Sequence, residues 1–144
     1  MKIFAISHVA FLVADLEKAR AFYEGVLGLA NDPARPDFDF AGVWYALGTQ
    51  QQIHLMQIPG TEAGLPRPQH PPGVRRGCNG LKPKQHTQHG GRDRHVALAA
   101  DGLAELAARL EAAGISYTRS KSGRDALFCL DPDGNALEFI VCKS

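Results

Sequence analysis

The chain of 144 residues contains two similar halves. The segment "HVAFLVADLEKARAFYEGVLGL" at 8–29 aligns with "HVALAADGLAELAARLEAAGI" at 95–115. In each copy His-Val-Ala begins an apolar run, an aspartate follows, and a glycine lies thirteen residues after that aspartate. Neither copy is long enough to bury a core by itself. The repeat therefore predicts two modules that pack together in one domain.

Each copy predicts a strand, a helix and then further strands. Apolar residues recur at three- and four-residue spacing after Asp15 and Asp101, which indicates helices with these aspartates as N-caps and Gly28 and Gly114 as stops. The strands predicted after the helices lie near 37–41, 43–47 and 52–58 in the first half, and near 116–119, 126–130 and 136–142 in the second. The turn "DPDG" at 131–134 joins the last two strands. Two βαβββ modules, and hence an α+β fold, are the prediction.

A segment rich in proline, glycine and basic residues separates the modules. We divide the single domain into a module at 1–59, a linker at 60–92 and a module at 93–144. Residues 62–94 hold seven arginines or lysines against two acidic residues, with no aromatic residue among them for stacking on bases. With a net charge of +1 for the whole chain, we expect no nucleic-acid or membrane partner.

The cysteines and the first residues bear on the compartment. Three cysteines, at 78, 129 and 142, have no metal-site spacing, so a reducing compartment is expected. The apolar start of the chain carries His8 and lacks a small-residue cleavage pattern. We therefore expect a first strand there and a cytoplasmic protein.

Four polar side chains lie within the apolar strands: His8, His54, His95 and Glu138. Their neighbours are apolar on both sides, so these strands are expected to be covered on both faces. A single histidine in such a place is often a neutral, hydrogen-bonded core residue. A buried, unpaired carboxylate costs several kcal/mol, so Glu138 must be protonated, meet a cation or bind a metal ion.

The repeat relates these four positions to one another. His8 and His95 begin the first strands of the two modules, and an offset of 84 residues aligns His54 with Glu138. A pseudo-twofold axis between the modules would bring all four side chains around one centre. One bound metal ion accounts for all of them.

These motifs resemble those of the vicinal oxygen chelate superfamily, which includes glyoxalase I, extradiol dioxygenases, fosfomycin-resistance transferases and bleomycin-resistance proteins. The resemblance rests on the first-half segment quoted above, on "DRHVALA" and on "FCLDPDGNALEF". It implies a cup-shaped mixed sheet with one divalent ion (Fe, Mn, Ni, Co or Zn), and a homodimer in which modules are sometimes exchanged. It implies His8, His95 and Glu138 as metal ligands, with His54 as a fourth ligand or an acid/base group.

The resemblance also implies a reaction class. We expect a metalloenzyme of isomerase, lyase or transferase type, acting on a small substrate that chelates the ion through oxygen atoms. His54 and Glu138 are the expected catalytic bases. An extradiol dioxygenase using His8, His95 and Glu138 is an alternative, although Phe128 stands where such members have a tyrosine. A metal-free protein that sequesters an antibiotic is another.

Four residues are expected to contact the substrate. Ser122 and Arg124 can hold an anionic group, unless their loop is a solvated turn. Trp44 and Phe128 are expected to line the cup, although for Trp44 a place in the core is an equal alternative. Fosfomycin-resistance members tend to have hydroxyl groups at the positions of Phe128 and Ala126, which argues against a phosphonate of that kind here.

Overall fold

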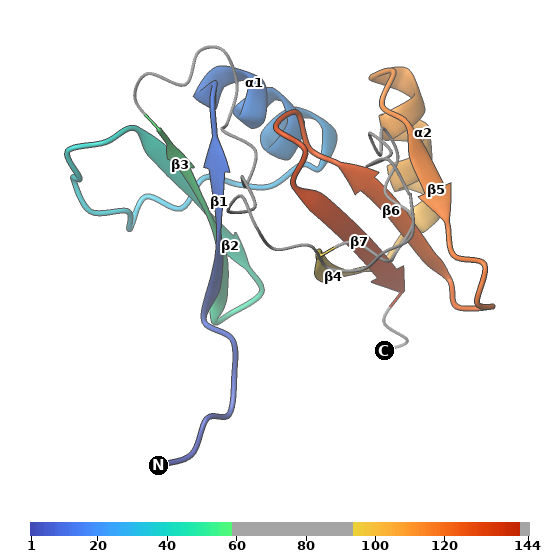
Figure 1. The fold of residues 1–144 in the computed structure, drawn as a ribbon, viewed down its shortest axis with the longest axis horizontal. Coiled ribbons are helices and arrows are strands. Elements are labelled where there is room, and N and C mark those ends of the chain that lie inside the picture. Colours follow the sequence, from blue (N-terminus) through green and yellow to red (C-terminus); the bar gives the residue numbers. More distant parts are fainter. Residues whose placement is uncertain (59–93, 142–144) are drawn as a thin grey trace, which may run out of the picture.

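Two mixed β-sheets, one from each half of the sequence, make up the computed structural model, which describes residues 1–58 and 94–141 (Figure 1). The first half contains β1 (His8–Val13), α1 (Leu16–Arg20), the π-helical η1 (Ala21–Val26), β2 (Gly42–Leu47) and β3 (Gln51–Gln57). The second half contains β4 (Val96–Ala100), α2 (Leu103–Ala112), β5 (Tyr117–Arg119), β6 (Ala126–Leu130) and β7 (Ala136–Val141). The predicted linker at 60–92 lies outside the described residues.

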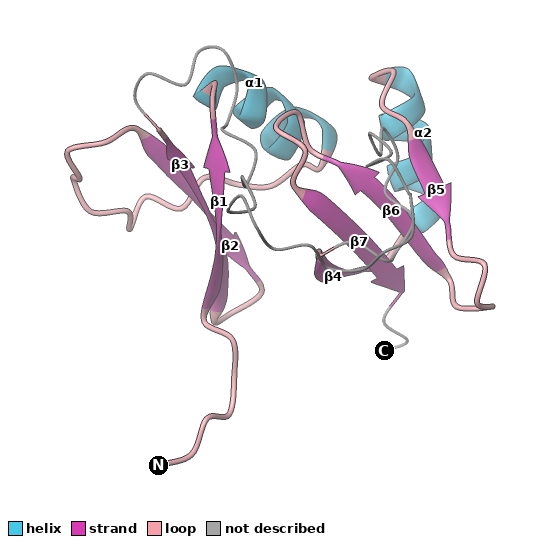
Figure 2. Ribbon diagram, in the orientation of Figure 1, coloured by secondary structure: helices cyan, strands magenta, loops and turns pink. Residues whose placement is uncertain are grey.

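Both sheets follow the same plan, as Figure 2 shows. The strand order is β1-β3-β2 in one sheet and β4-β7-β6-β5 in the other. In each sheet the first strand pairs parallel with the last, and the remaining pairs are antiparallel. The predicted α+β fold of two mixed sheets is therefore confirmed. Among the described residues, no helix has the length and apolar character needed to cross a membrane.

The strand register confirms the internal equivalence inferred from the offset of 84 residues. His54 on β3 stands opposite Ala10 on one side and Trp44 on the other. Glu138 on β7 stands opposite Ala97 and Phe128 in the same way. The two polar residues thus occupy matching places at the centres of the two sheets.

The predicted strand at 37–41 is wrong. This segment is a loop, and only an isolated bridge between Asn31 and Tyr45 extends the sheet beyond β2. The guanidinium of Arg35 explains the loop, because Nη2 donates to the carbonyl of Phe40 at 2.7 Å and the group also lies 5.0 Å from the ring centre of Phe38. The carbonyl of Phe40 is thereby taken from any strand ladder.

The helix boundaries follow the sequence with one exception. The Asp15 side chain accepts a hydrogen bond from the amide of Lys18 at 3.1 Å, as expected of an N-cap. Asp101 is not the second N-cap, because α2 begins after Gly102 without a side-chain cap. Gly28 and Gly114 follow the helices with φ values of 73° and 67°, the left-handed conformation that stops a helix.

The two modules share one core. The cluster of buried apolar side chains combines Val13, Phe22, Tyr45 and Leu55 of the first half with Leu106, Leu110, Leu127 and Phe139 of the second. The helix α2 packs on β6 and β7 and also contacts η1. Each such large side chain contributes about 1.5 to 3 kcal/mol when fully buried.

The turn between β6 and β7 fastens the modules at one end. The Tyr23 hydroxyl of η1 donates to the buried carboxylate of Asp131 at 2.9 Å. The Ala14 amide donates to the Asp133 carboxylate at 2.9 Å, and the Asn135 side-chain amide donates to the Leu12 carbonyl at 3.3 Å. The "DPDG" turn therefore connects two modules as well as two strands.

The expectation that the site strands are covered on both faces is wrong for β1 and β4. His8, Ala10 and Leu12 are exposed along one face of β1, and Ala97 and Ala99 are exposed on β4. These two strands form the free edges of their sheets and have apolar contacts on one face only. The central strands differ, because His54 and Glu138 are only 8% and 4% exposed.

Replacing Tyr23 by Phe tests the fastening at the turn. The substitution leaves the buried Asp131 without one of its donors, so the free energy of unfolding should fall by about 1 to 3 kcal/mol in urea denaturation. Tyr117→Phe is the matched control, because the Tyr117 hydroxyl contacts Glu111 at an exposed site and its loss should cost much less. Equal losses in the two variants would show that the turn does not hold the modules.

Candidate metal centre

The structure brings the four predicted ligands together as two pairs. His95 pairs with Glu138 in the second sheet, and His8 pairs with His54 in the first. Within residues 1–58 and 94–141, no three or more His, Cys, Asp or Glu side chains are grouped so as to hold a metal ion. Each module thus supplies half of the predicted ligand set.

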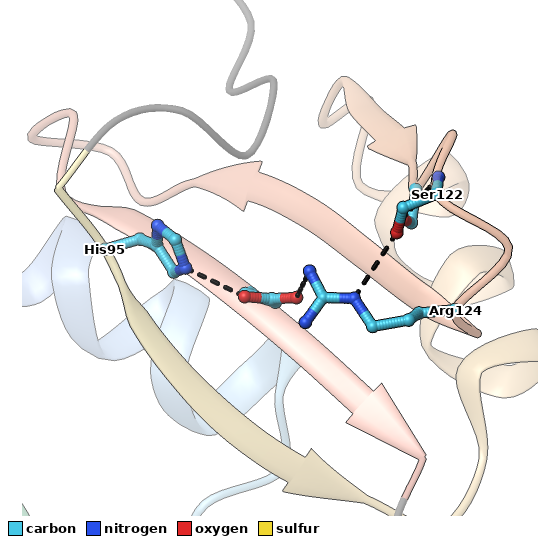
Figure 3. Close-up of polar contacts among 5 residues, drawn as sticks. His95, Ser122 and Arg124 are labelled. Atoms are coloured by element: carbon cyan, nitrogen blue, oxygen red, sulfur yellow. Dashed lines mark hydrogen bonds and ion pairs between the residues drawn. The ribbon is translucent and has the colours of Figure 1, made fainter.

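The His95–Glu138 pair has the character of a half-formed metal site. His95 Nε2 lies 2.8 Å from Glu138 Oε2, and their side chains are 23% and 6% exposed (Figure 3). The other carboxylate oxygen, Glu138 Oε1, is buried and accepts no hydrogen bond. A carboxylate and an imidazole are donors that suit the divalent ions from manganese to zinc. The chemistry of this pair therefore fits the expected ion.

A cation from the protein lies beside the unbonded oxygen. Arg124 Nη2 is 3.7 Å from Glu138 Oε1, although the Arg124 side chain is 69% exposed. The Ser122 hydroxyl lies 3.3 Å from Arg124 Nε, and a second hydroxyl, that of Ser120, lies 2.8 Å from that of Ser122. The predicted anion-holding residues thus adjoin the predicted metal ligand, as Figure 3 shows.

The His8–His54 pair has a different geometry. The two rings stack at 4.3 Å with an interplanar angle of 12°, and Trp44 stacks on the other face of His54 at 4.0 Å and 5°. The lone pairs of an imidazole lie in the ring plane, so two parallel rings do not converge on one ion. As placed, His8 and His54 do not serve jointly as ligands.

The two predicted aromatic contacts take different positions. Trp44 is half-buried in the stack on His54 and lies 6.2 Å from Phe38. Phe128 is 5% exposed and meets the His95 ring edge-on at 6.2 Å. Phe128 thus packs against a predicted ligand, whereas Trp44 holds His54 in place.

Two residues that the sequence did not single out contact His54. His54 Nε2 lies 2.9 Å from Gln52 Oε1, and Gln52 Nε2 donates to Asp32 Oδ2 at 2.7 Å. The spacing of Gln52 and His54 on one face of a strand was a usable signal. Asp32 comes from the loop before β2, and no periodic pattern indicated its place.

Cavities lie near one pair and away from the other. A cavity of about 330 Å³ is lined by His95 and Arg94 together with Val9 and Phe11 of β1. Another, of about 360 Å³, lies between Leu47, Leu98 and Arg109 and contains none of the four predicted ligands. The first cavity is therefore the one that adjoins the predicted chemistry.

Comparisons with known proteins agree with this fold. The sequence model of the Glyoxalase/Bleomycin resistance protein/Dioxygenase superfamily matches residues 5–139. Glyoxylase I 4 of Arabidopsis thaliana is 28% identical over 145 residues, which is 97% of this chain and 72% of the plant protein. Metallothiol transferase FosB of Lysinibacillus sphaericus (strain C3-41) is 41% identical over 56 residues, 37% of this chain and 40% of the transferase.

The fold recurs in a protein described as binding rather than converting its ligand. The crystal structure of TnmS3, an antibiotic binding protein from Streptomyces sp. CB03234, has a TM-score of 0.64 and 20% identity over 99% of each chain. This likeness concerns the fold alone.

The surroundings of His54 predict its titration. Burial lowers the pKa of His54 below its ordinary value of 6.5, and nearby His8 lowers it further, whereas Asp32 raises it. Because the unfolded chain then binds more protons, the free energy of unfolding should decrease as the pH falls below 6.5. In an NMR titration of the metal-free protein, we expect His8→Gln to raise the pKa of His54 only partly, because burial is the larger cause.

The control for this titration is His95→Gln, which lies in the other sheet and should leave His54 unchanged. A pKa of His54 at or above 6.5 in the wild-type chain would contradict the described burial.

Proposed function

Because the chain belongs to the Glyoxalase/Bleomycin resistance protein/Dioxygenase superfamily, we propose that it is a divalent-metal-dependent enzyme acting on a small molecule. His8, His95 and Glu138 would hold the ion. The observation that carries this proposal is the environment of Glu138, a buried carboxylate with an imidazole at one oxygen and no hydrogen-bond donor at the other. When bound, a divalent ion would supply Lewis-acid stabilisation of negative charge on substrate oxygens.

The substrate we propose carries neighbouring oxygen atoms and an anionic group. Arg124 is mostly exposed, and the Ser122 hydroxyl contacts only its Nε atom. Its remaining N–H donors suit a carboxylate or similar group of the substrate, in the planar geometry that guanidinium favours. An isomerase, lyase or transferase reaction follows from such a substrate.

His54 is proposed to move the substrate proton. Its ring is only 8% exposed, stacks between Trp44 and His8, and has a lowered pKa, so it is neutral and basic near neutral pH. A neutral imidazole takes a proton at one nitrogen while keeping the other N–H as a donor. Such a group suits proton abstraction next to a carbonyl.

A homodimer is part of the proposal. In one chain the His8–His54 pair and the His95–Glu138 pair belong to different sheets. The exposed faces of β1 and β4 leave the side of each pair open to another protein surface. We propose that a second copy brings its first module to the second module of this chain, which completes the ligand set.

One observation favours a second candidate, a metal-free binding protein. Arg124 is placed to balance the charge of Glu138, so the His95–Glu138–Arg124 cluster needs no metal ion for charge neutrality. In that case the same surface would bind a small ligand without converting it. Metal content distinguishes the two functions.

Elemental analysis of the protein, purified without a histidine tag, tests the metal proposal. We expect one divalent ion per site, and Glu138→Gln should weaken Mn(II) or Zn(II) binding by more than about 100-fold. That loss exceeds the roughly 10- to 100-fold typical of a residue that only supports a ligand. The far-ultraviolet circular dichroism should be unchanged.

Glu111→Gln is the control, because Glu111 contacts an exposed tyrosine hydroxyl far from the pair in sequence. Wild-type protein that binds neither ion under any condition would favour the metal-free binding protein instead.

Mixed dimers test the shared site. Chains carrying His8→Ala and chains carrying Glu138→Ala, each with a different peptide tag, should each bind no metal as homodimers. In the mixed dimer both substitutions fall in one shared site and leave the other intact, so about half of the wild-type metal should return. Sites built within single chains would give no recovery.

A further inference from the structure

We infer that Asp32 and Gln52 are positioning residues that hold His54 in its Nε2–H tautomer, leaving Nδ1 as the only basic nitrogen of the ring. The inference rests on the proposed function, because it specifies how His54 would take up a proton. It also separates His54 from the metal ligands, since a nitrogen that carries a proton donates no lone pair to a metal ion.

Hydrogen-bond chemistry fixes the direction of the chain of contacts. An ionised carboxylate only accepts hydrogen bonds, so the end of the Gln52 amide at 2.7 Å from Asp32 Oδ2 must be its NH₂ group. The other end, at 2.9 Å from His54 Nε2, is then the carbonyl oxygen, which also only accepts. His54 Nε2 must therefore carry the proton.

Asp32 is itself fixed in place by the backbone around it. Its amide donates to the carbonyl of Trp44 at 2.7 Å, and its Oδ1 accepts from the amide of Ala34 at 2.9 Å. Asp32 thus reaches His54 through Gln52 while it is bonded to Trp44, whose ring stacks on His54. The carboxylate has one oxygen for its own loop and one for Gln52.

The ring of His54 has little freedom to turn away from this arrangement. Trp44 and His8 lie on its two faces at 4.0 and 4.3 Å, nearly parallel to it. Exchanging Nε2 for Nδ1 at Gln52 would require the ring to rotate out of both stacks. Among the described residues, none donates a hydrogen bond to Nδ1.

The chemical consequence concerns the proton and its charge. When Nδ1 takes a proton from a carbon next to a carbonyl, the electron pair of the broken C–H bond passes into the substrate as an enolate. The imidazolium that forms keeps its Nε2–H bond to Gln52, and the carboxylate of Asp32 lies beyond that amide. Asp32 therefore stabilises the positive charge without accepting a proton.

Nitrogen NMR of the metal-free, ¹⁵N-labelled full chain tests the inference. At alkaline pH, where the ring is neutral, the wild-type spectrum should show His54 as the Nε2–H tautomer, assigned by its loss in His54→Gln. Gln52→Met keeps the side-chain length but removes the acceptor, so the ratio of Nε2–H to Nδ1–H should fall at least about fivefold. Asp32→Asn should give a smaller fall, because an asparagine can accept or donate.

Gln51→Met is the matched control, since Gln51 is an exposed neighbour on the same strand and the ratio should stay unchanged. A wild-type Nδ1–H tautomer, or the same ratio in Gln52→Met and the wild type, would overturn the inference.

Zinc addition separates this inference from the proposed function. We expect Zn(II) to shift the signals of His95 while the Nε2–H proton of His54 remains. Displacement of that proton by Zn(II) would make His54 a ligand through Nε2 and overturn the inference, with the metal function intact. If Zn(II) binds nowhere, the metal function fails, and the metal-free spectrum still decides the tautomer.

Discussion

The placement of the two modules depends on the hydrogen-bonded turn at Asp131–Asn135. Asp131 is buried at 5% exposure and receives donors from Tyr23, Asn135 and the amide of Asp133. Burial alone raises the pKa of this carboxyl, and these donors oppose that rise. An ionised group so far from water is tolerated only because each lone pair has a partner. The turn thereby links β6 and β7 of one module to η1 and the end of β1 of the other, and so sets which sheet edges stay exposed.

The repeat in the sequence was enough to predict the sheets and the equivalence of their centres. His54 and Glu138 stand opposite matching neighbours because strand register follows from the alternation of apolar residues, and both copies keep that alternation. The predicted strand at 37–41 failed for a local reason. Arg35 binds the loop carbonyl of Phe40 and lies over two phenylalanine rings, and such contacts leave no periodic trace in a sequence. Asp101 failed as an N-cap because Gly102 lies between it and the helix.

The site was predicted in its parts, and the way its parts meet was beyond the sequence. The pseudo-twofold argument placed four side chains at matching positions, and the structure brings them together as two pairs. Pairing within a module depends on neighbouring strands, which sequence patterns predict well. Meeting between modules depends on which faces come together, and exposed faces on β1 and β4 are compatible with contacts inside one chain or across two. Apolar periodicity carries no information on that choice, since each arrangement buries the same residues.

The two copies have diverged in chemistry while keeping their geometry. The offset of 84 residues that relates His54 to Glu138 relates Gln52 to Ala136, so the second module lacks the amide that holds the ring in the first. Glu138 contacts an imidazole and a guanidinium instead, which suits a group that stays ionised and holds a cation. His54 contacts a neutral amide and two aromatic faces, which suits a group that is neutral at rest and takes up a proton. One repeated scaffold thus supports a charged position and a basic position at equivalent points, and that division of tasks is what general base chemistry beside a bound cation requires.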